Sequence, residues 1–154
     1  MKESSISRVK ILLVEDNPDD IELTKKAFAK EKFSNPIKII KDGQKALEYF
    51  RDICSSKDSS EEDFPGLILL DINLPKVSGI ELLKYIKNTN KLKRVPVVIL
   101  TTSKRDEDII ASYDLGVNSY LQKPVAFSKF VETIRNIQLY WVLTNTPPII
   151  EEEN

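Results

Sequence analysis

The sequence predicts an α/β protein with a doubly wound sheet of five parallel strands. Three short apolar runs, at residues 9–14, 67–70 and 95–100, have the near-continuous hydrophobicity of strands that are covered on both faces. Segments of helical period separate the strands, and parallel strands joined in this way need helices on both faces of the sheet. With 154 residues, the chain has room for one such domain.

Five strands are expected in all. The three apolar runs are the best defined, and two weaker candidates lie at residues 36–41 and 118–122. Pro96 falls near the start of its run, where a missing N–H is tolerated. The order of elements along the chain is therefore βαβαβαβαβα.

The first helix is predicted to begin at Pro18, because asparagine is a good N-cap and proline suits the first helical position. In each of five helices, apolar residues recur at the spacing of one helix face. These faces comprise Ile21, Thr24, Ala27 and Phe28; Ala46, Leu47, Phe50, Ile53 and Cys54; Ile80, Leu83 and Ile86; Ile109, Ile110 and Tyr113, ending near Gly116; and Phe127, Phe130, Val131, Ile134, Ile137 and Trp141.

Composition excludes several classes of function. The 23 Lys and Arg against 24 Asp and Glu give a net charge of −1, which provides no general attraction to nucleic acid or anionic lipid. The chain has no histidine, so imidazole bases and Ser-His or Cys-His nucleophiles are excluded. A single cysteine, Cys54, excludes Cys/His zinc sites and internal disulfides. We expect a cytoplasmic location without membrane contact, since no signal peptide or membrane-length apolar run is present.

Reactive side chains follow four of the predicted strands. Glu15 and Asp16 follow the first strand, Asp71 the third, Thr101 the fourth and Lys123 the fifth. The carboxyl ends of parallel strands meet at one edge of the sheet, which is where open α/β sheets bind their ligands. Each residue also has a simpler interpretation, as a helix cap, a first-turn acid or a solvated turn residue. Their joint occurrence at four strand ends favours a functional site.

Three carboxylates at one edge repel each other by roughly 4 kcal/mol per pair at about 4 Å and an effective dielectric near 20. Shared protons, a lysine or a divalent cation must offset this repulsion. Oxygen ligands favour Mg²⁺, which commonly binds together with a phosphate. A carboxylate can itself act as the nucleophile and form an aspartyl phosphate. Asp71 is the best candidate, because it lies between the acidic pair and the hydroxyl.

Four separated motifs occur along the chain in a fixed order. They are Val14-Glu15-Asp16-Asn17, Leu70-Asp71-Ile72-Asn73-Leu74-Pro75 with Ser78-Gly79, Leu100-Thr101-Thr102, and Tyr120-Leu121-Gln122-Lys123-Pro124. Over residues 9–141 the sequence thus resembles the receiver domains of the two-component response regulator family. The resemblance implies a flavodoxin-like (βα)₅ fold with strand order 2-1-3-4-5.

The resemblance also implies a role for each matching residue. Asp71 would accept a phosphoryl group from a phosphohistidine on a sensor histidine kinase. Mg²⁺ or Mn²⁺ would be bound by the carboxylates of Asp16 and Asp71, by the backbone carbonyl of Asn73 and, through water, by Glu15. Lys123 would pair with Asp71 and then with the phosphate.

Signalling would depend on two side chains that change rotamer, Thr101 and Tyr120. They would couple the site to the face formed by the fourth helix, the fifth strand and the fifth helix. Structural roles are implied for Pro124, which would follow a cis peptide bond, and for Gly79. Asn73 and Thr102 are candidate modulators of water access and of the aspartyl-phosphate lifetime.

The expected organisation is an N-terminal tail at 1–8, a receiver domain at 9–142 and a C-terminal extension at 143–154. Only 13 residues follow Trp141, so we expect a stand-alone receiver that signals by protein contact. Near this end, Leu139, Tyr140, Trp141 and Leu143 make the helix apolar on nearly all sides. We expect a homodimer or docking surface there; the alternative is that the segment folds back on its own domain. A weaker resemblance to the small regulators that partner bacterial phytochromes suggests a phytochrome-type kinase.

Two other classes are disfavoured. A haloacid-dehalogenase-type phosphatase would need a second aspartate two residues after the nucleophile, where Asn73 stands. A flavin or nucleotide module would need a glycine-rich phosphate loop, but the four glycines are at least 13 residues apart. A phosphorylation-independent adaptor or dimerisation module of the same fold remains the alternative function.

Overall fold

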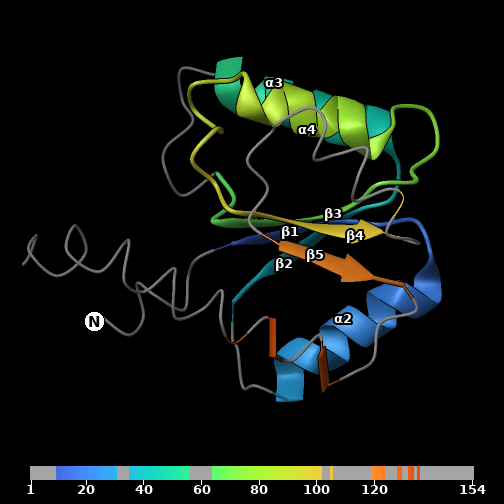
Figure 1. Ribbon diagram of the computed structural model, residues 1–154. Helices are drawn as coiled ribbons and strands as arrows, with labels where there is room; N and C mark the ends of the chain where they lie inside the picture. Colours follow the sequence, from blue (N-terminus) through green and yellow to red (C-terminus); the bar gives the residue numbers. More distant parts are fainter. Residues whose placement is uncertain are drawn as a thin grey trace, which may run out of the picture.

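The computed structural model describes residues 10–30, 35–55, 64–101, 105, 119–123, 128–129, 132–133 and 135, without the side chains of residues 27, 28, 30, 101 and 119. Within these residues, five parallel strands form one sheet in the order β2-β1-β3-β4-β5 (Figure 1). The strands are β1 (Ile11–Val14), β2 (Ile37–Ile40), β3 (Leu67–Asp71), β4 (Val97–Thr101) and β5 (Ser119–Gln122). The predicted fold class and strand order are confirmed.

Helices cover both faces of the sheet, as a doubly wound fold requires. Helices α3 (Gly43–Ser55) and α4 (Gly79–Lys87) lie on one face, and α2 (Pro18–Lys30) lies on the other (Figure 1). They correspond to the first three predicted helices. The apolar residues of the predicted fourth and fifth helices lie outside the described residues, although the backbone of residues 128–129, 132–133 and 135 is helical.

Two strands end later than the sequence suggested, because backbone pairing continues beyond the apolar run. Asp71 is the last residue of β3 and pairs in register with Leu100 of β4, and the Ile72 N–H still donates to the Leu100 carbonyl at 3.0 Å. Thr101 is likewise the last residue of β4. The same strand starts later than predicted, since the Val95 N–H closes a turn onto the Leu92 carbonyl at 2.9 Å.

The core consists of two apolar layers, because successive strand residues point to opposite faces of the sheet. In β1, Leu12 and Val14 pack toward α3 and α4, whereas Ile11 and Leu13 belong to the layer that contains Ile21 of α2. The side chains that α3 and α4 bury in the first layer are Ala46, Phe50, Ile53, Leu82, Leu83 and Ile86. Each large apolar side chain buried in this way stabilises the fold by roughly 1.5–3 kcal/mol.

Local hydrogen bonds start the helices beside the carboxyl ends of the strands. Asn17 caps α2 as predicted, because its Oδ1 accepts from the N–H groups of Asp19 and Asp20 at 2.8 and 3.2 Å. Ser78 and Glu81 form a reciprocal capping box at the start of α4. These caps fix the first turns of α2 and α4 near the polar edge of the sheet.

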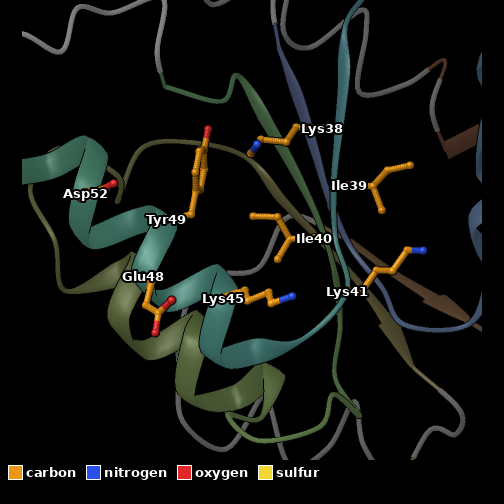
Figure 2. Close-up of a pocket in the computed structure, with 8 residues that line it drawn as sticks. All are labelled: Lys38, Ile39, Ile40, Lys41, Lys45, Glu48, Tyr49 and Asp52. Atoms are coloured by element: carbon orange, nitrogen blue, oxygen red, sulfur yellow. The ribbon is translucent and has the colours of Figure 1, made fainter.

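A groove lies between β2, an edge strand, and α3 (Figure 2). It is lined by Lys38, Ile39, Ile40, Lys41, Lys45, Glu48, Tyr49 and Asp52. Lys38 Nζ lies 5.3 Å from the centroid of the Tyr49 ring, at cation–π distance. None of the acidic residues at the strand ends lines this groove. Within the described residues, no helix has the length and hydropathy to cross a membrane.

Candidate functional site

The register of the sheet brings Glu15 and Asp71 together. Val14 of β1 pairs with Leu70 of β3, so the next residue on each strand emerges at the same height. Both acids are buried: the exposed fraction is 0% for Glu15 and 2% for Asp71. Two adjacent buried carboxylates repel each other strongly, so a nearby cation or a bound proton must offset the repulsion.

That cation is Lys123, which follows the last residue of β5. Its Nζ lies 3.1 Å from both carboxylate oxygens of Glu15 and 3.2 Å from Asp71 Oδ2. It also lies 3.1 Å from Oδ2 of Asp20 on α2. One ammonium group therefore contacts three carboxylates: Glu15 directly after β1, Asp20 on α2 and Asp71 at the end of β3. We call Glu15, Asp16, Asp20, Asp71 and Lys123 the acidic cluster.

Asp20 is the member of the acidic cluster that the sequence analysis did not identify. As the third residue of α2, it has the position of an ordinary first-turn acid. No pattern along the chain distinguishes Asp20 from its equally acidic neighbour Asp19, because Asp16 precedes the Asn17 cap and so shares no helix face with Asp20.

Burial shifts the proton affinity of Glu15. Its Oε2 accepts hydrogen bonds from the Asn17 N–H at 3.2 Å and from Lys123 at 3.1 Å. Desolvation, followed by the negative charge of Asp71, raises the pKa of Glu15 to about 7 against the opposing effect of Lys123. Burial alone would lower the pKa of Lys123, but the charges of Glu15 and Asp71 and the hydrogen bonds to Glu15 and Asp20 raise it above its usual range. Lys123 is therefore charged at neutral pH.

Asp71 is held at both of its oxygens. Its Oδ1 accepts a hydrogen bond from the Asn73 N–H at 3.0 Å, and its Oδ2 faces Lys123. The following loop folds back on the end of β3, and the Gly79 N–H donates to the Ile72 carbonyl at 3.1 Å. A Cβ on Gly79 would collide with the backbone oxygen of Asp71 and lie 2.6 Å from the Ile72 Cα. Only glycine therefore allows α4 to start so close to Asp71.

The carboxylates fit a hard divalent cation. Glu15, Asp16 and Asp71 each offer one oxygen, and these three oxygens lie within 4.8 Å of one another. Glu15 Oε1 is buried and accepts no hydrogen bond within the described residues, although Lys123 lies near it. A buried oxygen without a hydrogen bond suits a water-bridged ligand. Oxygen donors of this kind are those that Mg²⁺ and Mn²⁺ bind.

For the other predicted site residues, the structure describes the side chain, the backbone alone or neither. Tyr120 on β5 is half-buried and packs against the α3/α4 core layer, and Asn73 is exposed directly after Asp71 and Ile72. The structure describes the backbone of Thr101 at the end of β4, two strands from β1, but not its hydroxyl. Residues outside the description are Thr102, Pro124, Leu139, Tyr140, Trp141 and Leu143.

Sequence comparisons identify relatives along most of the chain. The model of the response regulator receiver domain matches residues 11–135. The probable methanogenesis regulatory protein FilR2 of Methanothrix harundinacea (strain 6Ac) is 41% identical over 138 residues, which is 90% of this chain and 86% of FilR2. The response regulator Rcp1 of Synechocystis is 39% identical over 138 residues, which is 90% of this chain and 92% of Rcp1.

Solved structures show the same fold at similar identity. The bacteriophytochrome response regulator RtBRR is 40% identical with a TM-score of 0.71, over 83% of this chain and 76% of that one. The phosphorylated cyanobacterial phytochrome response regulator RcpA is 40% identical with a TM-score of 0.70, over 89% and 96%. The Mn²⁺-bound form of Rcp1 is 39% identical with a TM-score of 0.68, over 86% and 93%.

The expected similarity to regulators that partner phytochromes is thus confirmed. The match over residues 11–135 coincides with the sheet and the acidic cluster described above. The chain belongs to the response regulator receiver domain family, the phosphoacceptor signalling domains of two-component systems.

Proposed function

We propose that Asp71 accepts a phosphoryl group from a phosphohistidine of a sensor histidine kinase, in a reaction that depends on Mg²⁺. The observation that carries this proposal is the buried Asp71 carboxylate, with Asn73 on one oxygen, Lys123 on the other and two further acids beside it. A carboxylate oxygen would attack phosphorus, so that an O–P bond forms while the N–P bond of phosphohistidine breaks. The bonding electron pair would stay on the imidazole, which is protonated on its second nitrogen and leaves as neutral histidine.

The acidic cluster supplies the groups that such a transfer needs. Phosphoryl transfer depends mainly on positioning and on neutralising charge. Asp16, Asp71, the Asn73 carbonyl and, through water, Glu15 would hold Mg²⁺ or Mn²⁺, which would neutralise charge on the phosphoryl oxygens. Lys123 would contact these oxygens from the β5 side. The phosphorylated structure of RcpA and the Mn²⁺-bound structure of Rcp1 support this assignment by similarity.

The signal would leave the site through Thr101 and Tyr120. Both lie on neighbouring strands, β4 and β5, and Tyr120 packs against the apolar core. A rotamer change of these two side chains would alter the face formed by β5 and the two expected helices around it. The names of RcpA and RtBRR support a kinase of the phytochrome type as the partner. Homodimerisation through Leu139, Tyr140, Trp141 and Leu143 is part of the same proposal.

A direct test is labelling with acetyl phosphate and Mg²⁺, followed by intact mass measurement. The unaltered chain should gain one phosphoryl group, and Asp71→Asn should gain none. Asp52→Asn, which changes an exposed acid on α3, is the matched control and should label normally. Continued labelling of Asp71→Asn would contradict the assignment of Asp71. No labelling of the unaltered chain would instead favour a phosphorylation-independent adaptor.

A further inference from the structure

We propose that Asp20 is a positioning residue for Lys123: it holds the ammonium group toward α2 in the unphosphorylated state and must release it when a phosphoryl group binds. Asp20 would therefore oppose phosphorylation. This inference rests on the proposed function and adds a regulatory residue to it.

Lys123 has fewer hydrogen-bond donors than there are carboxylate oxygens around it. An ammonium group has three N–H donors and no acceptor. Four carboxylate oxygens from Glu15, Asp20 and Asp71 lie within 3.2 Å of its Nζ. The oxygens at contact distance from Lys123 thus outnumber its three donors. A further anion would therefore compete with contacts that Lys123 already makes.

A phosphoryl group on Asp71 would draw the Lys123 side chain outward. It would add strong acceptor oxygens and about −1.5 to −2 charges at neutral pH. These oxygens would lie beyond the carboxylate of Asp71, so Lys123 would have to move outward to reach them. Because its Nζ is already at contact distance from both Glu15 and Asp20, this movement would lengthen at least one of these contacts.

Glu15 and Asp20, the two partners that compete for Lys123, differ in burial. Glu15 is fully buried, and its Oε2 is fixed by the Asn17 N–H. The Asp20 side chain is 25% exposed at the start of α2, so water can take the place of the ammonium group there. Leaving a buried carboxylate without a partner costs far more than rehydrating an exposed one. Asp20 is therefore the contact that is released.

Asp19 provides a matched control for this inference. It carries the same charge in the same helical turn, and its N–H also donates to the Asn17 cap. Within the described residues, no ion pair joins Asp19 to Lys123. Weaker long-range repulsion would raise the affinity for a phosphoryl mimic equally in Asp19→Asn and Asp20→Asn. Loss of the Lys123 contact would raise this affinity only in Asp20→Asn.

The experiment measures the affinity of the full chain for beryllofluoride, a phosphoryl mimic that binds an aspartate carboxylate, by calorimetry at saturating Mg²⁺. Asp20→Asn should bind beryllofluoride about threefold to tenfold more tightly than the unaltered chain, the range expected for loss of one partly exposed ion pair. Asp19→Asn should stay within about twofold. Asp20→Glu, which restores a carboxylate, should return the affinity toward that of the unaltered chain.

A gain in affinity distinguishes the proposed role from structural damage, because a disturbed site would bind beryllofluoride more weakly. Equal affinities of Asp19→Asn and Asp20→Asn, or weaker binding by Asp20→Asn, would overturn the inference. Either result would leave the proposed function standing if the unaltered chain binds beryllofluoride. If the unaltered chain fails to bind it, the proposed function and the inference both fail.

Discussion

Lys123 and Asp71 form an ion pair across an intervening strand, with 3.2 Å between Nζ and Oδ2. Lys123 follows β5 and Asp71 ends β3, and β4 lies between these two strands in the sheet. The lysine side chain therefore spans the carboxyl edge of the sheet. This contact links an edge strand to the buried acids at the centre.

Lys123→Met should destabilise the chain and prevent efficient phosphorylation. The lysine side chain is only 14% exposed, and its removal leaves buried carboxylates without a cation. Without metal, we expect the free energy of unfolding to fall by about 3 kcal/mol or more, as for other broken buried ion pairs. Urea unfolding in EDTA measures the stability, and acetyl phosphate labelling measures the activity. Lys45→Met, an exposed control on α3, should change neither; equal losses in both variants would contradict this prediction.

The stability of the metal-free chain should fall as pH rises from about 4.5 to about 7. In this window the folded chain keeps a proton on Glu15 that the unfolded chain has lost, because burial and the charge of Asp71 raise the pKa of Glu15 from 4.5 to about 7. The fall attributable to Glu15 is on the order of 3 kcal/mol and is complete above the folded-state pKa. Glu15→Gln should remove this contribution from the pH profile of urea unfolding. The exposed control Glu22→Gln should retain it, and an unchanged profile in Glu15→Gln would refute the assignment.

Mg²⁺ should stabilise the chain, and more strongly at pH 8 than at pH 5. A divalent cation binds the ionised form of the acidic cluster, so protonation of Glu15 at low pH competes with it. At 100 times its Kd, Mg²⁺ should add about 2.7 kcal/mol to the free energy of unfolding. Thermal melts with Mg²⁺ and with EDTA provide the measurement. Asp16→Asn should lose most of the effect and Asp52→Asn none; full Mg²⁺ stabilisation of Asp16→Asn would exclude it as a ligand.

Gly79→Ala should displace the backbone at Asp71. The added Cβ would collide with the backbone oxygen of Asp71, so either β3 or the start of α4 must shift. Overpacking of this kind costs about 1–3 kcal/mol of stability. Phosphorylation by acetyl phosphate should slow as well, because the nucleophile moves. Ser78→Ala removes the adjacent cap without adding an atom, so it should lower stability but largely spare the labelling rate. An unchanged labelling rate in Gly79→Ala would show that the start of α4 moves to accommodate the methyl group while Asp71 stays in place.

Lys76→Gly should stabilise the loop between β3 and α4. Lys76 has a φ of 72°, a left-handed conformation that glycine adopts readily and other residues adopt at a cost of about 1–2 kcal/mol. Part of this gain is lost to the greater freedom of glycine in the unfolded chain, so we expect a net gain of up to about 1 kcal/mol in urea unfolding. Lys76→Ala keeps the strained φ and removes the same ion pair to Asp42, so it should not stabilise. A gain in both variants would assign the effect to the ion pair rather than to φ.

Local patterns predicted the elements of the fold well. Asn17 and Pro18 mark the start of α2 because a cap and a fixed φ act within one helical turn. The apolar runs around Leu12, Leu69 and Ile99 predicted central strands because burial on both faces requires continuous hydrophobicity. Strand ends were less well predicted: Asp71 belongs to β3 because its backbone pairs with β4, and this pairing leaves no signal in the side chain.

The sequence by itself determined the alternation of strands and helices and the presence of Glu15, Asp16, Asp71 and Lys123 at the carboxyl ends of strands. These features depend on residue type and on neighbours within a few positions. The pairing of Lys123 with Asp71 was expected from the family resemblance, but only the tertiary structure decided that Glu15 and Asp20 contact the same ammonium group. It also decided that Glu15 has a pKa of about 7, because both burial and the approach of Asp71 depend on how the sheet assembles. Electrostatic effects depend on distance in space, and the sequence records only distance along the chain.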